Sequence, residues 1–162
     1  MNIRYAPTAR GGRLYSGEFR CLHCRQVISV DLTRSRVHNR NHCPYCLYSR
    51  HLDLYEAGDR LAACKEKMQP VALTIKKTRK KYGSGKGEIM LIHQCVDCGT
   101  LSINRIAADD DAATILDIFR SSIEYPIHAL CEGNGIAPLR STDSDALHRQ
   151  LFGGNKIPVP VW

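Results

Sequence analysis

The stretch CLHCRQVISVDLTRSRVHNRNHCPYC, residues 21–46, decides the fold because it carries two cysteine pairs of the form Cys-x-x-Cys. Cys21 and Cys24 form the first pair, Cys43 and Cys46 form the second, and 18 residues separate the pairs. Each pair places two sulfur atoms on one side of a backbone turn, and two facing turns supply the tetrahedron that zinc prefers, with bonds of about 2.3 Å. The spacing is typical of a structural zinc site. We therefore predict one zinc ion held by these four cysteines.

Two other chemistries use similar cysteine pairs. The sequence from Cys43 to Cys46, Cys-Pro-Tyr-Cys, is also that of a glutaredoxin active site. A redox pair of that kind lies in a βαβ pattern, whereas this one follows the polar residues 40–42 and no such pattern comes after it. A zinc deaminase needs a His-x-Glu sequence, which this chain lacks. The sequence thus favours structural metal binding over redox catalysis or deamination.

A second zinc site is indicated further along the chain. Cys95 and Cys98 form a third pair, and Gly99 after them tolerates the positive φ that such turns often need. Cys64 precedes the strand that leads toward this pair, where a zinc ribbon places its other turn. The fourth ligand stays open, with His93 as first choice and His128 or Cys131 as alternatives.

The eight cysteines of this 162-residue chain also indicate a compartment. The N-terminus has arginines but no apolar stretch like that of a secretory signal, and no run of residues approaches the roughly 18–20 apolar residues of a membrane span. Disulfides are disfavoured in reducing compartments. We therefore expect a cytoplasmic protein whose cysteines bind metal.

The pattern of apolar residues predicts a small β-rich body over residues 18–108, built as a zinc ribbon or a treble-knuckle fold. One strand is expected near residues 26–32, and Val71–Ile75 with Glu88–His93 should form a hairpin around a long basic loop, residues 76–87. We thus place a zinc-binding domain at residues 18–125.

A single helix is expected at about residues 110–123. Its apolar residues recur at helical spacing, and the aspartates at 109–111 suit its N-terminal end. Glycine and proline break any regular element in residues 1–17, which we interpret as a flexible basic arm. Residues 126–162 contain glycine, proline and asparagine at short intervals, so we expect an extended tail.

The pentapeptide Arg40-Asn41-His42-Cys43-Pro44 resembles the RNHCP family of small, mostly bacterial proteins, which is named for it. The likeness covers roughly residues 18–122 and extends to Tyr45–Asp53, Gly58–Arg60, Cys64, His93–Gly99 and Asn104–Ile106. It implies that the cysteines are zinc ligands and that His93 is one too. The chain departs from the family in its N-terminal arm, its lysine-rich loop and its tail. The resemblance therefore supports metal binding and does not indicate an activity.

The charge of the chain is unevenly distributed. Residues 1–94 hold 18 Lys and Arg against 7 Asp and Glu, whereas residues 95–162 hold 5 against 9, for a net charge of +7. Two bound zinc ions with their thiolates would lower the net charge to about +4. A positive excess of this kind favours a polyanionic partner, of which nucleic acid is the commonest.

The densest basic segment, Lys76–Lys86, carries six cations and one aromatic residue. Cations neutralise phosphates, and Tyr82 could stack on an unpaired base. We predict that the protein binds RNA, as a ribosome-associated protein that contacts ribosomal RNA. The alternatives are a protein-interaction module, a DNA-binding module and a nuclease-like enzyme using His38, His42 or His51. The predicted RNA contacts are Lys76, Lys77, Arg79, Lys80, Lys81, Tyr82, Lys86, Arg10, Arg13 and Arg40.

Overall fold

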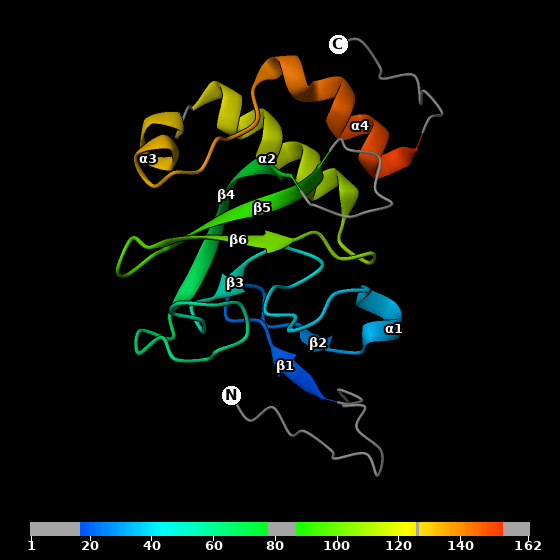
Figure 1. The fold of residues 1–162 in the computed structure, drawn as a ribbon. Coiled ribbons are helices and arrows are strands. Elements are labelled where there is room, and N and C mark those ends of the chain that lie inside the picture. The colour runs from blue at the N-terminus through cyan, green and yellow to red at the C-terminus, as the bar shows by residue number, and fades with distance from the viewer. Residues whose placement is uncertain (1–16, 78–86, 126, 154–162) are drawn as a thin grey trace.

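Two antiparallel sheets form the framework of the molecule (Figure 1). The computed structural model describes residues 17–77, 87–125 and 127–153. The smaller sheet pairs β1 (Glu18–Arg20) with β2 (Val27–Ser29). The larger sheet has the order β3-β4-β5-β6, with β3 at Ser49–Arg50, β4 at Lys67–Lys76, β5 at Glu88–Cys95 and β6 at Leu101–Arg105. The fold is therefore β-rich, as the sequence predicts.

The hairpin of β4 and β5 is the centre of the larger sheet. Leu73 pairs with Leu91 across it, and both side chains are fully buried. Nearly every residue of β5 is buried, because the strand has neighbours on both edges and is covered on both faces. The predicted hairpin is thus present, with strands longer than the sequence pattern indicated. Its basic connection, residues 78–86, lies outside the described residues.

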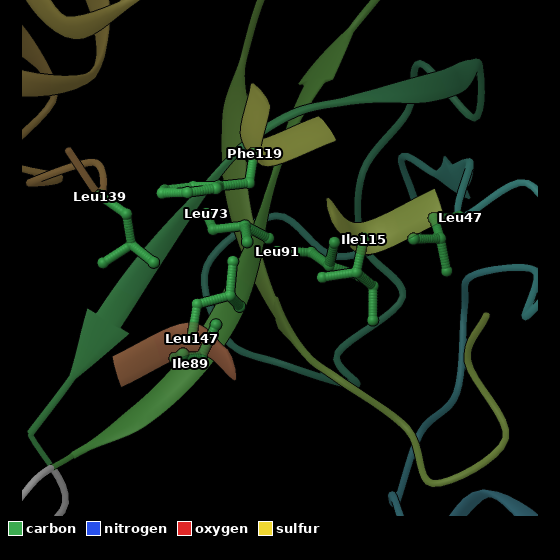
Figure 2. Packing of buried hydrophobic residues seen from close by; sticks show 8 residues of the cluster. All are labelled: Leu47, Leu73, Ile89, Leu91, Ile115, Phe119, Leu139 and Leu147. Atoms are coloured by element: carbon green, nitrogen blue, oxygen red, sulfur yellow. The ribbon is translucent and has the colours of Figure 1, made fainter. Parts of the chain in front are cut away.

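Helix α2 (Ala112–Glu124) covers one face of this sheet. It begins after Asp111, whose side chain accepts a hydrogen bond from the Thr114 amide and satisfies one of the free N–H groups of the first turn. Ile115 and Phe119 project from α2 onto the sheet (Figure 2). The helix predicted at about residues 110–123 is therefore present at that position.

The C-terminal part departs from the predicted extended tail. Residues 127–153 form α3 (His128–Gly133), a short 3-10 helix η1 (Ser141–Asp143) and α4 (Ser144–Phe152). Leu147 packs into the core beside β5 (Figure 2), which a tail lying on the surface could not do. Leu151, one helical turn further on, is partly buried against the same cluster. The segment before η1 also pairs with the sheet, since the Leu139 amide donates to the Leu73 carbonyl at 2.7 Å. The extended-tail prediction is therefore wrong for residues 127–153, and residues 154–162 lie outside the described residues.

A second, smaller core lies at the opposite end of the molecule from these helices (Figure 1). Phe19, Ile28 and Val30 pack there with the four cysteines of residues 21–46. Helix α1 (Leu32–Ser35) follows β2, so the strand expected at residues 26–32 ends early, at Ser29. The arm at residues 1–16 lies outside the described residues. Among the described helices, none has the length and apolar character needed to cross a membrane.

Candidate metal centres

The three Cys-x-x-Cys turns share one backbone geometry. In each, the amide of the first cysteine donates to the carbonyl five residues later, from Cys21 to Gln26 (2.9 Å), from Cys43 to Tyr48 (3.0 Å) and from Cys95 to Thr100 (2.9 Å). The residue after the second cysteine has a positive φ, 66° at Arg25, 59° at Leu47 and 74° at Gly99. Only the third turn uses glycine for this conformation, which other residues adopt at some cost in strain. All three turns are therefore built as metal-binding knuckles.

The first two knuckles face each other and bring four sulfur atoms together. The Sγ atoms of Cys21 and Cys46 are 3.6 Å apart, and those of Cys24 and Cys43 are also 3.6 Å apart. All four lie within 4.8 Å of one another. A zinc ion with bonds of about 2.3 Å requires an S–S edge of about 3.8 Å. A disulfide would need about 2.05 Å. The cluster thus has the size of a zinc tetrahedron.

The electrostatics of this first cluster favour a thiolate. A hydrogen bond from the Cys46 thiol, together with the backbone amides of Cys46 and Tyr45, lowers the pKa of Cys43 to about 5 against the cost of burial. Thiolates, not thiols, bind metal. All four ligands come from the protein and two of them are buried, so the cluster leaves no position for a substrate. Its donors fit structural zinc.

The second cluster consists of His51, Cys64, Cys95 and Cys98. The Sγ atoms of Cys64 and Cys95 are 3.6 Å apart, and the Cys98 sulfur lies 3.3 Å from Nδ1 of His51. An ideal zinc tetrahedron has an S–N edge of about 3.6 Å. Hydrogen bonds from the Thr100 hydroxyl and amide lower the pKa of Cys98 to about 6. This cluster also fits zinc, with a histidine as the fourth ligand.

His51 is the ligand that comes from the residue directly after β3. Its amide donates to the Glu66 carbonyl at 2.8 Å, which ties His51 to the turn that carries Cys64. That turn has Lys65 at φ 56°, a backbone conformation that favours glycine. Cys98 is the exposed member of the cluster, so the second centre lies closer to solvent than the first.

The sequence interpretation chose His93 as the fourth ligand, and the structure corrects this. His93 is fully buried in β5, and its Nε2 lies 2.7 Å from the Leu47 carbonyl. That carbonyl can only accept, so Nε2 carries the proton and Nδ1 accepts from the Asn104 amide at 2.9 Å. Burial, with a smaller contribution from nearby His42, lowers the pKa of His93 to about 3. Both ring nitrogens of this neutral histidine have protein partners, which leaves neither for a metal.

The two alternative ligands also lie elsewhere. His128 is near the Leu139 carbonyl at 3.5 Å, and Cys131 is buried in an apolar cluster with Ala72 and Ile92. Neither belongs to the two groups of potential metal ligands in the described part of the chain. Cys131 is therefore a core residue of α3.

The pentapeptide at residues 40–44 forms a buried ion-pair network beside these centres. Arg40, with a side chain 1% exposed, donates to both carboxylate oxygens of Asp109 at 2.8 Å and lies 3.2 Å from Asp110. His42 Nε2 is 2.8 Å from the same Asp110, whose side chain is fully buried. The carboxylate of Asp110 also accepts from the Ala107 amide at 2.7 Å. The network ties the second knuckle to the start of α2.

This network corrects two interpretations. Arg40 was expected to contact RNA, but its guanidinium is buried and paired with carboxylates, so it is a structural residue. The aspartates at 109–111 were expected to cap the helix together, whereas only Asp111 does so and the other two bind Arg40 and His42. The sequence shows that residue 40 is a cation, but it does not show whether the side chain is buried.

The comparison with known families agrees with this geometry, because residues 16–116 match the RNHCP domain. The chain belongs to the RNHCP family. The match includes both cysteine clusters of the RNHCP domain and the Arg40 network, and it ends within α2. No match was found among curated proteins or among solved structures.

Of the nine remaining predicted RNA contacts, the structure describes only two. These are Lys76 and Lys77, which are exposed at the end of β4 and at the start of the basic segment. The other seven lie outside the described residues: Arg10, Arg13, Arg79, Lys80, Lys81, Tyr82 and Lys86.

Proposed function

We propose that this RNHCP protein is a zinc-stabilised RNA-binding protein of the cytoplasm that associates with ribosomes. Two zinc ions would hold the fold, one on the four cysteines of the first cluster and one on His51 and its three cysteines. Both donor sets are complete without a substrate or water, which is typical of structural and not catalytic zinc. The function then depends on the surface around the metal centres.

The observation that supports RNA most directly is a group of arginines at the first zinc centre. Four exposed arginines lie on the turn, strand and helix around it, and none forms an ion pair within the described residues: Arg20, Arg25, Arg34 and Arg36. Two of the three exposed arginines at the helical end, residues 112–153, contrast with them, since Arg120 pairs with Asp117 and Arg140 pairs with Glu132. Unpaired guanidinium groups are suited to phosphate oxygens, which they contact in bidentate geometry.

Binding of a labelled single-stranded RNA tests this proposal. Neutralising Arg25, Arg34 and Arg36 with glutamine should weaken binding and flatten its salt dependence by about 0.7 log units per lost phosphate contact. A control variant that replaces Arg120, Arg140 and Arg149 removes the same charge from the helical end and should leave both quantities nearly unchanged. Equal losses in the two triple variants would mean that binding follows net charge alone, and salt-insensitive binding would contradict the proposal.

Association with ribosomes needs a separate experiment. The native protein should sediment with ribosomes at low salt and dissociate from them at high salt, because phosphate contacts release counterions. The triple arginine variant should remain in the soluble fraction at a salt concentration where the control variant still sediments. Absence of the wild-type protein from the ribosome pellet at low salt would remove the ribosome from the proposal.

A further inference from the structure

A groove runs beside β6, between this strand and the loop that follows β3. It consists of two adjoining cavities of about 560 Å³ and 210 Å³. The larger volume lies in the range of pockets that bind small molecules or parts of larger ligands. The two cavities share six lining residues: Asn41, Asp53, Tyr55, Ala57, Ile103 and Asn104. The second residue of the pentapeptide therefore lies where the two cavities meet.

Asn41 places an accessible amide where the two cavities of this groove meet. It is only 8% exposed, yet its side-chain amide has no hydrogen-bond partner among the described residues. The neighbouring buried side chains of Arg40, His42 and Ser49 all have partners. The amide atoms of Asn41 are not among the buried unpaired polar atoms of the described residues, so they remain accessible in the groove and open to a ligand. An amide that offers a donor and an acceptor to a groove is suited to the hydrogen-bonding edge of a nucleobase.

Tyr55 supplies the aromatic surface that a base would need. Its side chain is 82% exposed, although it lines both cavities. A large exposed aromatic ring beside polar groups is the arrangement on which unpaired bases stack. Asn39 and His38 line the same larger cavity and add hydrogen-bonding groups.

The charge of the groove differs between the part suited to a base and the part suited to phosphates. Arg105, on the wall of the larger cavity, is paired with Glu88 at 2.7 Å, so this part of the groove is close to neutral. Lys76 lines the same cavity, and Lys77 beside it is exposed. A neutral planar group thus fits inside the groove, and an anionic backbone fits along Lys76 and Lys77.

We propose that this groove binds an unpaired nucleobase of an RNA strand, with Tyr55 stacking on the base and Asn41 hydrogen-bonding to its edge. The proposal rests on the proposed RNA-binding function and assigns it a site. The strand continues from the groove toward the exposed side chains of Lys76 and Lys77, which its phosphates contact. Base identity is read at Asn41, whereas Tyr55 stacks on any base.

The test compares a labelled RNA 12-mer with the same strand carrying abasic ribose at its central positions. The wild-type protein should bind the intact strand about 5- to 150-fold more tightly, the range expected for one stacked base. Tyr55→Ala should abolish this ratio and leave the affinity for the abasic strand unchanged. Tyr125→Ala, which removes a ring that is 74% exposed and outside the groove, should keep the ratio.

Asn41→Ala gives a second readout, the ranking of oligo(A), oligo(C), oligo(G) and oligo(U) strands. It should compress the differences among the four strands, with zinc content and melting temperature confirming that the variant is folded. Equal binding of intact and abasic RNA by the wild-type protein would overturn the groove proposal. A preference for intact over abasic RNA that is lost in Tyr82→Ala but kept in Tyr55→Ala would overturn it too. In either case salt-dependent RNA binding would leave the proposed function standing. No binding to any RNA would overturn both.

Discussion

Replacing His51 and His93 in separate variants distinguishes a metal ligand from a buried structural histidine. His51→Ala should lower the zinc content from two ions toward one, because Nδ1 of His51 completes the second cluster at 3.3 Å from the Cys98 sulfur. Structural zinc contributes roughly 10–16 kcal/mol in small domains, so one of four equal ligands carries about 2.5–4 kcal/mol. Its loss should weaken the second zinc by about two to three orders of magnitude.

His93→Gln provides the matched comparison. It should keep two zinc ions, since both nitrogens of His93 bind protein groups, and it should instead lower the free energy of unfolding by about 1–3 kcal/mol through unpaired buried groups. His51→Cys should restore the second ion, because a thiolate replaces the imidazole in the same tetrahedron. The assay is zinc content by mass spectrometry after dialysis against a competing chelator. Loss of one zinc from His93→Gln with two retained by His51→Ala would refute the assignment.

Three further predictions concern stability. Asp110→Asn should lower the free energy of unfolding by about 3–5 kcal/mol in chemical denaturation, because it leaves the buried Arg40 and His42 without their shared carboxylate. The control Asp117→Asn, on the exposed face of α2, should change this free energy by less than about 1 kcal/mol. Acid should destabilise the fold from below about pH 6.5 toward pH 3, because His93 has a pKa of about 3 when folded and near 6.5 when unfolded, so the unfolded state binds the extra proton. The loss is about 1.4 kcal/mol per pH unit, and it should be smaller in His93→Gln. Chelation of zinc should unfold the β1–β2 unit, whose core contains the first cluster, as loss of amide hydrogen-exchange protection at residues 18–30; full protection in metal-free protein would contradict this.

The metal centres could largely be predicted from the sequence because a Cys-x-x-Cys turn is local. Its hydrogen bonds join residues at most five positions apart, so the few residues after Cys21 and after Cys43 are enough to predict these two turns. His51 is different, since it joins the second cluster through pairing with the turn at Glu66. The sequence does contain one signal for His51: it is a histidine between the second knuckle and Cys64, and Cys64 is a cysteine outside any Cys-x-x-Cys pair. His93, two residues before Cys95, was nearer in sequence but lies inside a strand.

The C-terminal helices and the buried network depend on tertiary contacts that the sequence does not display. The spacing of Leu147 and Leu151 is compatible with a helix, but the pattern is short and follows several helix-breaking residues. Packing beside β5 stabilises α4, and Gln150 bonds to the backbone of Ile89 and Gly87 at the start of that strand. Arg40 likewise finds its acidic partners 69 and 70 residues away.

X-ray absorption at the zinc edge of the purified protein tests the central claim most directly. The structure predicts two zinc ions per chain with a combined first shell of seven sulfur atoms and one nitrogen, or about 3.5 sulfurs and 0.5 nitrogen per ion. His51→Cys should move this average to four sulfurs. A single zinc per chain, or a shell rich in oxygen or in several nitrogens, would contradict two closed structural centres.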